Sequence, residues 1–152
     1  MKKMIAPLFA ALLLFCSCGD VYRTYETYEV VRPGVEMFTD YIDVMGRDWK
    51  IDGAEGKPGC YVYQEFKFPE VNKAVLDKGA VLVYLVDASG RDNILPYVFP
   101  VENEYGKKLM QNIRFDVDEG MITLVVEWED FKVYGLDDFR FKVCILSQGT
   151  AK

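Results

Sequence analysis

The stretch AVLVYLVD, from Ala80 to Asp87, decides the fold. Its residues are apolar on both faces of an extended chain, which is typical of a central strand buried on both sides. Around it, other stretches alternate apolar and polar residues with the period of two that indicates a half-buried strand. These stretches are residues 35–45, 60–68, 94–99, 111–117, 121–128 and 139–145. The pattern predicts a domain built almost wholly of β-strands.

Alternation also assigns side chains to faces. In the last strand, Arg140, Lys142 and Cys144 point outward, and the core-facing row is Phe139, Phe141, Val143 and Ile145. In residues 60–68, Cys60 faces inward and Gln64 is a polar exception in the inward row. An even pair of cysteines leaves a Cys60–Cys144 disulfide open as an alternative, but a bridge needs Cβ atoms about 4 Å apart. The assigned faces point these two side chains apart.

Turn and helix signals interrupt the strands. DVDEGMI predicts a hairpin in which Gly120 has a positive φ. Its acids, Asp116, Asp118 and Glu119, faintly resemble a calcium loop, but an EF-hand needs flanking helices. PEVNKAVLDKG, residues 69–79, has helix start and stop signals and predicts one short crossover helix. Pro96 makes residues 94–99 an edge strand or a bulge.

Together these signals predict an all-β fold. Seven or eight short antiparallel strands favour a single β-sandwich of immunoglobulin-like or jelly-roll type over residues 35–149. Trp49 and Trp128 are expected to fill its ends or its core.

The N-terminus resembles a secretory signal. Lys2 and Lys3 precede an apolar run from Met4 to Phe15, which is shorter than the roughly 20 residues of a membrane-spanning helix. FCSCGD, residues 15–20, then resembles the lipobox of bacterial lipoproteins, with Phe15 where that motif usually has leucine. The resemblance implies cleavage after residue 17 and lipid attachment at Cys18, with Cys16 removed. One alternative is an ordinary secretory signal that is cleaved off. The other is a metal site formed by Cys16 and Cys18, which is disfavoured because the chain has no histidine.

Residues 18–34 differ from the rest of the chain. After the lipid-bearing Cys18, Tyr22, Tyr25 and Tyr28 recur every three residues, a period that suits an extended polyproline-like segment. We interpret residues 18–34 as the lipid anchor and a tether. An aromatic docking strip and an added edge strand are the alternatives.

Six stretches, in order, resemble one group of proteins. They are RDWK, YVYQEFKFPEV, VLDKGAVLVYL, LPYVF, GMITLVVEW and FRFKVCIL, within residues 36–147. As a set they are similar to small β-sandwich lipoproteins of the Bacteroides group. The resemblance implies a lipid-anchored, extracytoplasmic β-sandwich. We expect it at the outer membrane, on either the periplasmic side or the cell-surface side. It carries no known catalytic residue.

Composition restricts the function classes. Without histidine, the chain offers no Ser-His-Asp triad and no imidazole metal site. The expected mature chain has 16 basic and 24 acidic residues, a net charge of −8, because residues 1–17 contain two lysines and no acid. Such a chain repels phosphate backbones, so nucleic acid is not an expected partner. Glu127, Glu129 and Asp130 resemble a glycosidase carboxylate set only weakly. No catalytic residue, metal or cofactor is expected.

Two function classes remain. The first is a non-catalytic binding or interaction module held at a membrane by its lipid, with a protein or a glycan as partner. Its candidate contact surface comprises Tyr61, Tyr63 and the three tether tyrosines, Tyr22, Tyr25 and Tyr28, since tyrosine offers large amphipathic area. The alternative is a structural or adhesive surface component, such as a fimbrial accessory subunit.

Overall fold

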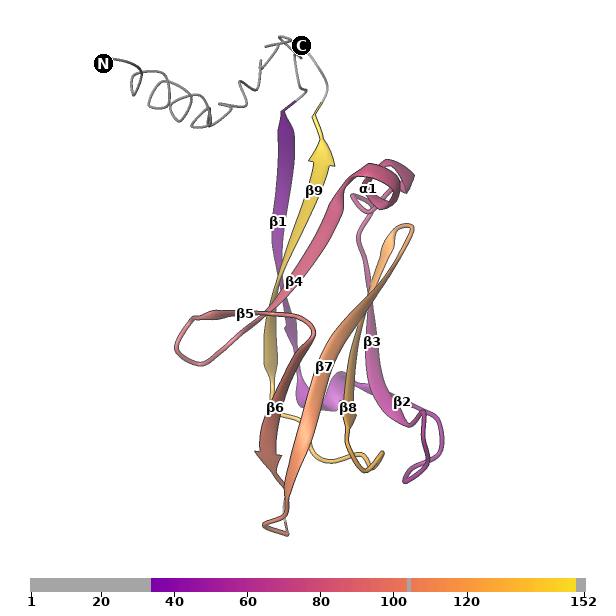
Figure 1. The fold of residues 1–152 in the computed structure, drawn as a ribbon, viewed down its shortest axis with the longest axis vertical. Helices are drawn as coiled ribbons and strands as arrows, with labels where there is room; N and C mark the ends of the chain where they lie inside the picture. Colours follow the sequence, from indigo (N-terminus) through magenta and orange to yellow (C-terminus); the bar gives the residue numbers. More distant parts are fainter. Residues whose placement is uncertain (1–33, 104, 150–152) are drawn as a thin grey trace, which may run out of the picture. The chain divides into compact units, whose positions relative to one another are not determined.

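Nine strands and two short helices make up the domain (Figure 1). The computed structural model describes residues 34–103 and 105–149. The strands are β1 (Val35–Val44), β2 (Lys50–Asp52), β3 (Tyr61–Lys67), β4 (Ala80–Val86), β5 (Asp92–Ile94), β6 (Tyr97–Glu102), β7 (Lys108–Asp118), β8 (Met121–Trp128) and β9 (Phe139–Gln148). A 3₁₀ helix spans Gly46–Asp48, and α1 spans Lys73–Lys78.

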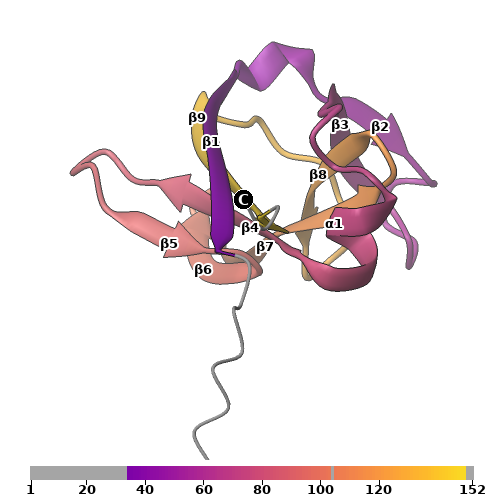
Figure 2. The same cartoon turned by 90° about the horizontal axis from the view of Figure 1, so that it is seen from above.

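The strands form two antiparallel sheets that pack face to face (Figure 2). One sheet has the order β1-β9-β4-β5 and the other has the order β2-β3-β8-β7-β6. Their inner faces share one apolar core, to which β9 contributes Phe141, Val143 and Ile145. The facing strand β8 contributes Ile122, Leu124, Val126 and Trp128. The prediction of an all-β sandwich is therefore confirmed, with Trp128 in its core.

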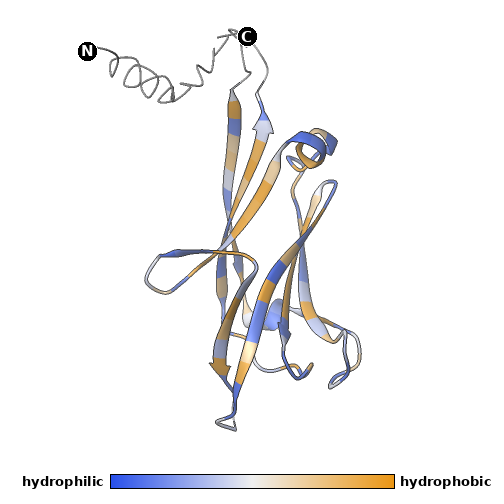
Figure 3. Ribbon diagram, in the orientation of Figure 1, coloured by the Kyte–Doolittle hydropathy of each residue, from blue (hydrophilic) through white to orange (hydrophobic). Residues whose placement is uncertain are grey.

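Strand β4 is central, as its sequence predicts, because it pairs with β9 on one side and with β5 on the other. Its inward residues Val83 and Leu85 are buried. Its outward residues are only half-buried, so burial on both faces is incomplete. Figure 3 shows hydrophobic residues along much of β4.

The segment around Pro96 differs from the prediction. Instead of one short strand over residues 94–99, the chain forms β5 at the edge of one sheet and β6 at the edge of the other. Leu95 and a cis-Pro96 link them. The proline therefore lies where the chain crosses from one sheet to the other. Its missing N–H costs no hydrogen bond between strands there.

The helix begins later than predicted. The Asn72 side chain accepts hydrogen bonds from the backbone N–H groups of Ala74 and Val75, so Asn72 is the N-cap. Residues before it are held by the β7–β8 turn, since the Gly120 N–H donates to the Val71 carbonyl. Gly79 ends the helix and lies so close to the Leu146 carbonyl oxygen that a Cβ would clash with it.

The β7–β8 hairpin is confirmed. Its strands pair in register from Gln111 opposite Trp128 to Asp118 opposite Met121. Gly120 has a φ of 76°, the left-handed conformation that this turn needs.

The two described cysteines are free. Cys60 is buried on the inner face, as expected, and burial together with the nearby Glu55 and Asp52 carboxylates raises the pKa of its thiol. Cys144 points to the outer face, but it is only 6 % exposed. Thr39 and Leu82 lie directly beside it on β1 and β4, which explains why an outward side chain is nevertheless covered.

The N-terminal predictions lie outside the described residues. They are the signal at 1–17, Cys18, the tether up to Pro33, and Tyr22, Tyr25 and Tyr28. Among the described residues, no helix has the length and apolar character needed to cross a membrane.

Candidate ligand-binding site

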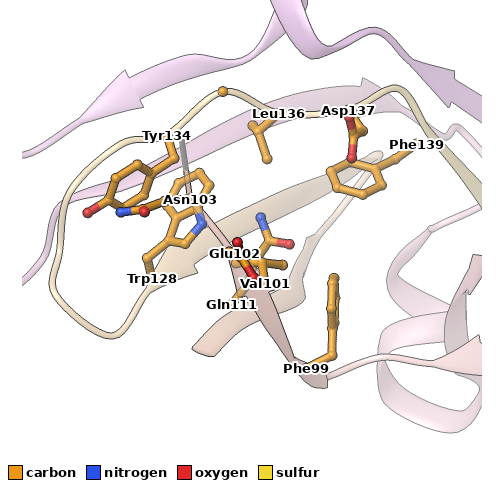
Figure 4. A pocket seen from close by; sticks show the side chains of 11 residues that line it. Phe99, Val101, Glu102, Asn103, Gln111, Trp128, Tyr134, Leu136, Asp137 and Phe139 are labelled. Carbon is orange, nitrogen blue, oxygen red and sulfur yellow. The ribbon is translucent and has the colours of Figure 1, made fainter. Parts of the chain in front are cut away.

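A cavity of about 270 Å³ lies at one end of the sandwich (Figure 4). Strands β6, β7 and β8 supply its floor, the start of β9 supplies one wall, and the β8–β9 loop covers it. Phe139, which lines the cavity, pairs with Val44 at the end of β1, whereas Val35 at its start pairs with Gln148. The cavity therefore lies at the opposite end of β1 from the point where the N-terminal segment enters the domain.

The floor is a single row of side chains across three strands. Gln111 of β7 pairs with Phe99 of β6 on one side and with Trp128 of β8 on the other. Directly paired residues of antiparallel strands point to the same face. An amide therefore lies between two aromatic rings on the inner face of the sheet.

Gln111 is the buried polar residue of the described core, with only 4 % of its surface exposed. Its neighbours in the inward row of β7 are the apolar Leu109 and Ile113. Its side-chain amide makes no hydrogen bond within the described residues, and its polar atoms, unlike the Gln64 amide oxygen, are not closed off from the cavity. In Figure 4 this amide points into the cavity between Trp128 and Phe139. A polar ligand in this cavity could therefore take the place of water as the hydrogen-bond partner of the amide.

Trp128 offers a second polar group. The residue is 3 % exposed; its indole N–H makes no hydrogen bond within residues 34–103 and 105–149 and, unlike the Trp49 N–H, is not closed off from the cavity. Figure 4 shows the indole nitrogen on the side of the ring that faces the Gln111 amide. Two unused polar groups therefore converge on one small space.

The β8–β9 loop that covers the cavity is held at several points. The Asp138 carboxylate accepts a hydrogen bond from the Gly46 N–H at 2.9 Å. The Phe131 carbonyl accepts one from the Gly56 N–H at 2.7 Å, and Phe131 itself has the strained positive φ of 57°. The Glu55 carboxylate accepts from the Val133 N–H at 3.2 Å. Contacts distant in sequence thus fix the loop in one shape.

Tyr134 forms part of the wall next to Trp128, with the two rings edge-to-face and 5.8 Å apart. Its hydroxyl donates to the Asp130 carboxylate at 2.9 Å. Burial and this hydrogen bond raise the pKa of Tyr134. Burial disfavours the charged form of Asp130, but hydrogen bonds from Tyr134, the Lys132 N–H and Lys107 lower its pKa overall. Asp130 therefore stays ionised and holds the ring in place.

The rim of the cavity is acidic. Glu102 and Asp137 are exposed, and no lysine or arginine belongs to the lining. Among the described residues, no three acidic or cysteine side chains are grouped closely enough to hold a metal ion. The site thus combines aromatic walls, amides and carboxylates.

The tyrosines predicted as contacts lie elsewhere. Tyr61 and Tyr63 point outward from β3, with their rings 6.1 Å apart in an edge-to-face arrangement. The Tyr61 hydroxyl donates to Asp52 at 2.7 Å, a hydrogen bond that raises its pKa. The Lys50 ammonium lies 5.5 Å from the centre of the Tyr63 ring. Both rings pack against neighbours on the sheet, and neither lines the cavity.

The acids considered for glycosidase chemistry do not act together in this structure. Glu127 accepts a hydrogen bond from the Asn112 amide at 2.7 Å on the outer face of the sheet. Asp130 is engaged with Tyr134 and Lys107 in the loop. Neither carboxylate is among the residues that line the cavity.

Sequence reasoning missed Gln111, although a signal was present. In the inward row of β7, which reads Leu109, Gln111, Ile113, Phe115 and Val117, glutamine is the single polar residue. Gln64 is likewise a polar residue in the inward row of its strand. Its amide oxygen is buried without a partner, but Gln64 does not line the cavity.

Comparisons with known proteins do not identify the chain: no protein-family model matches it, and neither does any curated protein or solved structure.

Proposed function

We propose that this protein is a lipid-anchored, extracytoplasmic domain that binds a ligand without catalysing its conversion. The observation that carries the proposal is the unpartnered Gln111 amide inside a preformed cavity. Ligand sites are typically concave and largely apolar, with a few polar groups that fix orientation. The lining has no serine, threonine, cysteine or lysine nucleophile, and its two carboxylates are at the exposed rim.

The position of the cavity supports a tethered role. The lipobox-like FCSCGD places a lipid at Cys18, before β1. Strand β1 has ten residues and spans about 33 Å at 3.3 Å per residue. A lipid attached before Val35 would therefore be joined to the end of β1 that is opposite to the cavity. The resemblance to small Bacteroides-group lipoproteins is consistent with this arrangement and with an outer-membrane location.

One observation favours the structural or adhesive alternative. Among the described residues, nothing pairs with the outer edge of β1 or with Gln64–Lys67 of β3 on the β2 side. A groove of about 440 Å³ between these edges has Phe38, Ile42 and Phe68 among its lining residues. An added strand from a partner would fit there. However, Glu36 and Asp40 place charges on the inward side of β1, a device that opposes strand pairing, so we rank this function second.

The binding function predicts a tryptophan signal. The chain has two tryptophans, Trp49 and Trp128, so a Trp49→Phe protein reports only on the cavity. We expect compounds from a small-molecule library to shift the Trp128 emission saturably. The matched control is Trp128→Phe: the remaining Trp49 lies outside the lining and contacts only the cavity residue Phe139, with ring centres 6.3 Å apart, so its response should be much weaker. A library that leaves Trp128 emission unchanged throughout would count against a binding role for the cavity.

The anchor is tested separately. A Cys18→Ala protein should leave the membrane fraction, whereas Cys16→Ala should remain in it. Mass spectrometry of the mature N-terminus should find Cys18 as its first residue, carrying acyl chains. A mature chain that starts at another residue would refute this part of the proposal.

A further inference from the structure

We propose that the cavity takes one uncharged sugar ring, either as a free sugar or as the terminal residue of a glycan. This inference rests on the proposed binding function and names the ligand class. It follows from four properties of the cavity: its polar groups, its aromatic walls, its charge and its size.

The polar groups suit hydroxyls. The Gln111 amide can donate and accept, and the Trp128 indole can only donate. Neither group makes a hydrogen bond within the described part of the chain, and neither is closed off from the cavity. A hydroxyl can satisfy either group because it also donates and accepts. A wholly apolar ligand would leave both groups buried and unpaired, at a cost in affinity.

The walls suit the C–H faces of a sugar ring. Phe99, Trp128 and Phe139 surround the Gln111 amide (Figure 4), and aromatic rings provide large apolar contact areas. A ligand that fits must therefore carry apolar faces and hydroxyl groups on the same small frame. A pyranose has that combination.

Charge excludes the acidic sugars. The lining includes the carboxylates of Glu102 and Asp137 and no lysine or arginine. A uronic acid, a sialic acid or a sugar phosphate would meet like charge without a counter-ion. The deepest polar groups are neutral, so a cation would find its carboxylate partners only at the exposed rim.

Size limits the ligand to about one ring. Sites for drug-sized ligands typically occupy about 300–1,000 Å³, and this cavity has about 270 Å³. A longer glycan would have to extend out past the rim acids, where hydroxyls can donate to Glu102 and Asp137. The site would then bind the terminal sugar of a glycan rather than an internal one.

The test uses the full-length, detergent-extracted protein and titration calorimetry. The probes are the methyl glycosides of glucose, galactose and mannose, and N-acetylglucosamine. Their charged counterparts are glucuronate, galacturonate, mannuronate and N-acetylglucosamine 6-phosphate, one for each neutral sugar, and tetramethylammonium is the cation. We expect at least one neutral sugar to bind, and its charged counterpart to bind at least tenfold more weakly. Immobilised oligosaccharides ending in the same sugar distinguish a glycan from a free sugar as the source.

Gln111→Met tests the site itself. It keeps the volume of the side chain but removes the amide, so sugar affinity should fall at least tenfold. Because no hydrogen bond to the described residues is lost, its melting temperature should be close to that of the unchanged protein. Gln64→Met is the matched control: it also removes a buried amide oxygen without a partner, but sugar binding should not change.

The outcomes separate this inference from the proposed function. If library compounds shift Trp128 emission but no neutral sugar binds, the sugar inference is wrong and the binding function stands. If tetramethylammonium or the acidic sugars bind more tightly than the neutral ones, the ligand class is wrong. If Gln111→Met lowers the melting temperature and leaves sugar affinity unchanged, Gln111 is structural and the cavity is not the sugar site.

Discussion

Replacing Phe141 by alanine is expected to bring the domain close to unfolding. Phe141 lies in the inward row of β9 and has no exposed surface. Its ring contacts that of Phe139, with the ring centres 6.0 Å apart. Removing a buried phenylalanine side chain typically costs ~3–5 kcal/mol, and domains of this size have ~5–15 kcal/mol to lose. A denaturant titration followed by circular dichroism should show the loss as a much lower midpoint.

The control must come from the outer face of the same strand. Lys142 is unsuitable, because its side chain is only 25 % exposed and is paired with the Asp92 carboxylate. That hydrogen bond raises the pKa of Lys142, although burial opposes the rise. Arg140 is more exposed: it makes a surface ion pair with Asp43 at 3.7 Å, and its guanidinium lies 4.9 Å from the centre of the Tyr41 ring. Arg140→Ala should therefore cost about 2 kcal/mol or less. Equal, mild effects of Phe141→Ala and Arg140→Ala would mean that the faces of β9 are assigned wrongly.

Strand alternation made most of the sandwich predictable. In an extended chain, alternate residues such as Phe141, Val143 and Ile145 all point to one face of the sheet. That face must be the one that packs in the core, so the sequence pattern predicts the tertiary packing. Two strands were missed because β2 and β5 have three residues each, too few to show a period. The helix start was misplaced because Val71, which fits a helical pattern, bonds instead to Gly120 across the fold.

The candidate site was far less predictable. Its floor joins Phe99, Gln111 and Trp128, which become neighbours only through the registers of two strand pairs. Alternation shows that Gln111 faces inward, but it does not show whether a partner lies opposite. The covering loop has no period at all, and its shape depends on distant groups such as Gly46 and Glu55. The tyrosines were conspicuous in the sequence, but the described pair packs on the outer face of the sheet.

Replacing Gly46 by alanine is expected to disrupt the cavity, although Gly46 does not line it. Gly46 has no positive φ, so glycine is not needed there for its backbone angles. It is needed because the Leu136 backbone lies against it: an added Cβ would be 2.9 Å from the Leu136 carbonyl carbon and nearer still to the oxygen. The clash is with backbone, so the covering loop must move. Leu136 and Asp137 of that loop line the cavity.

Two measurements should change together in Gly46→Ala. Overpacking typically costs ~1–3 kcal/mol, so the unfolding midpoint should fall. The Trp128 emission, read in the Trp49→Phe background, should no longer respond to ligands that bind the unchanged cavity. Gly34→Ala is the matched control, because a Cβ there would meet nothing within 4 Å and the backbone needs no positive φ; its stability and its Trp128 response should be unchanged. If Gly46→Ala binds ligand normally, the loop does not define the site, and the floor row of Phe99, Gln111 and Trp128 must be sufficient for binding.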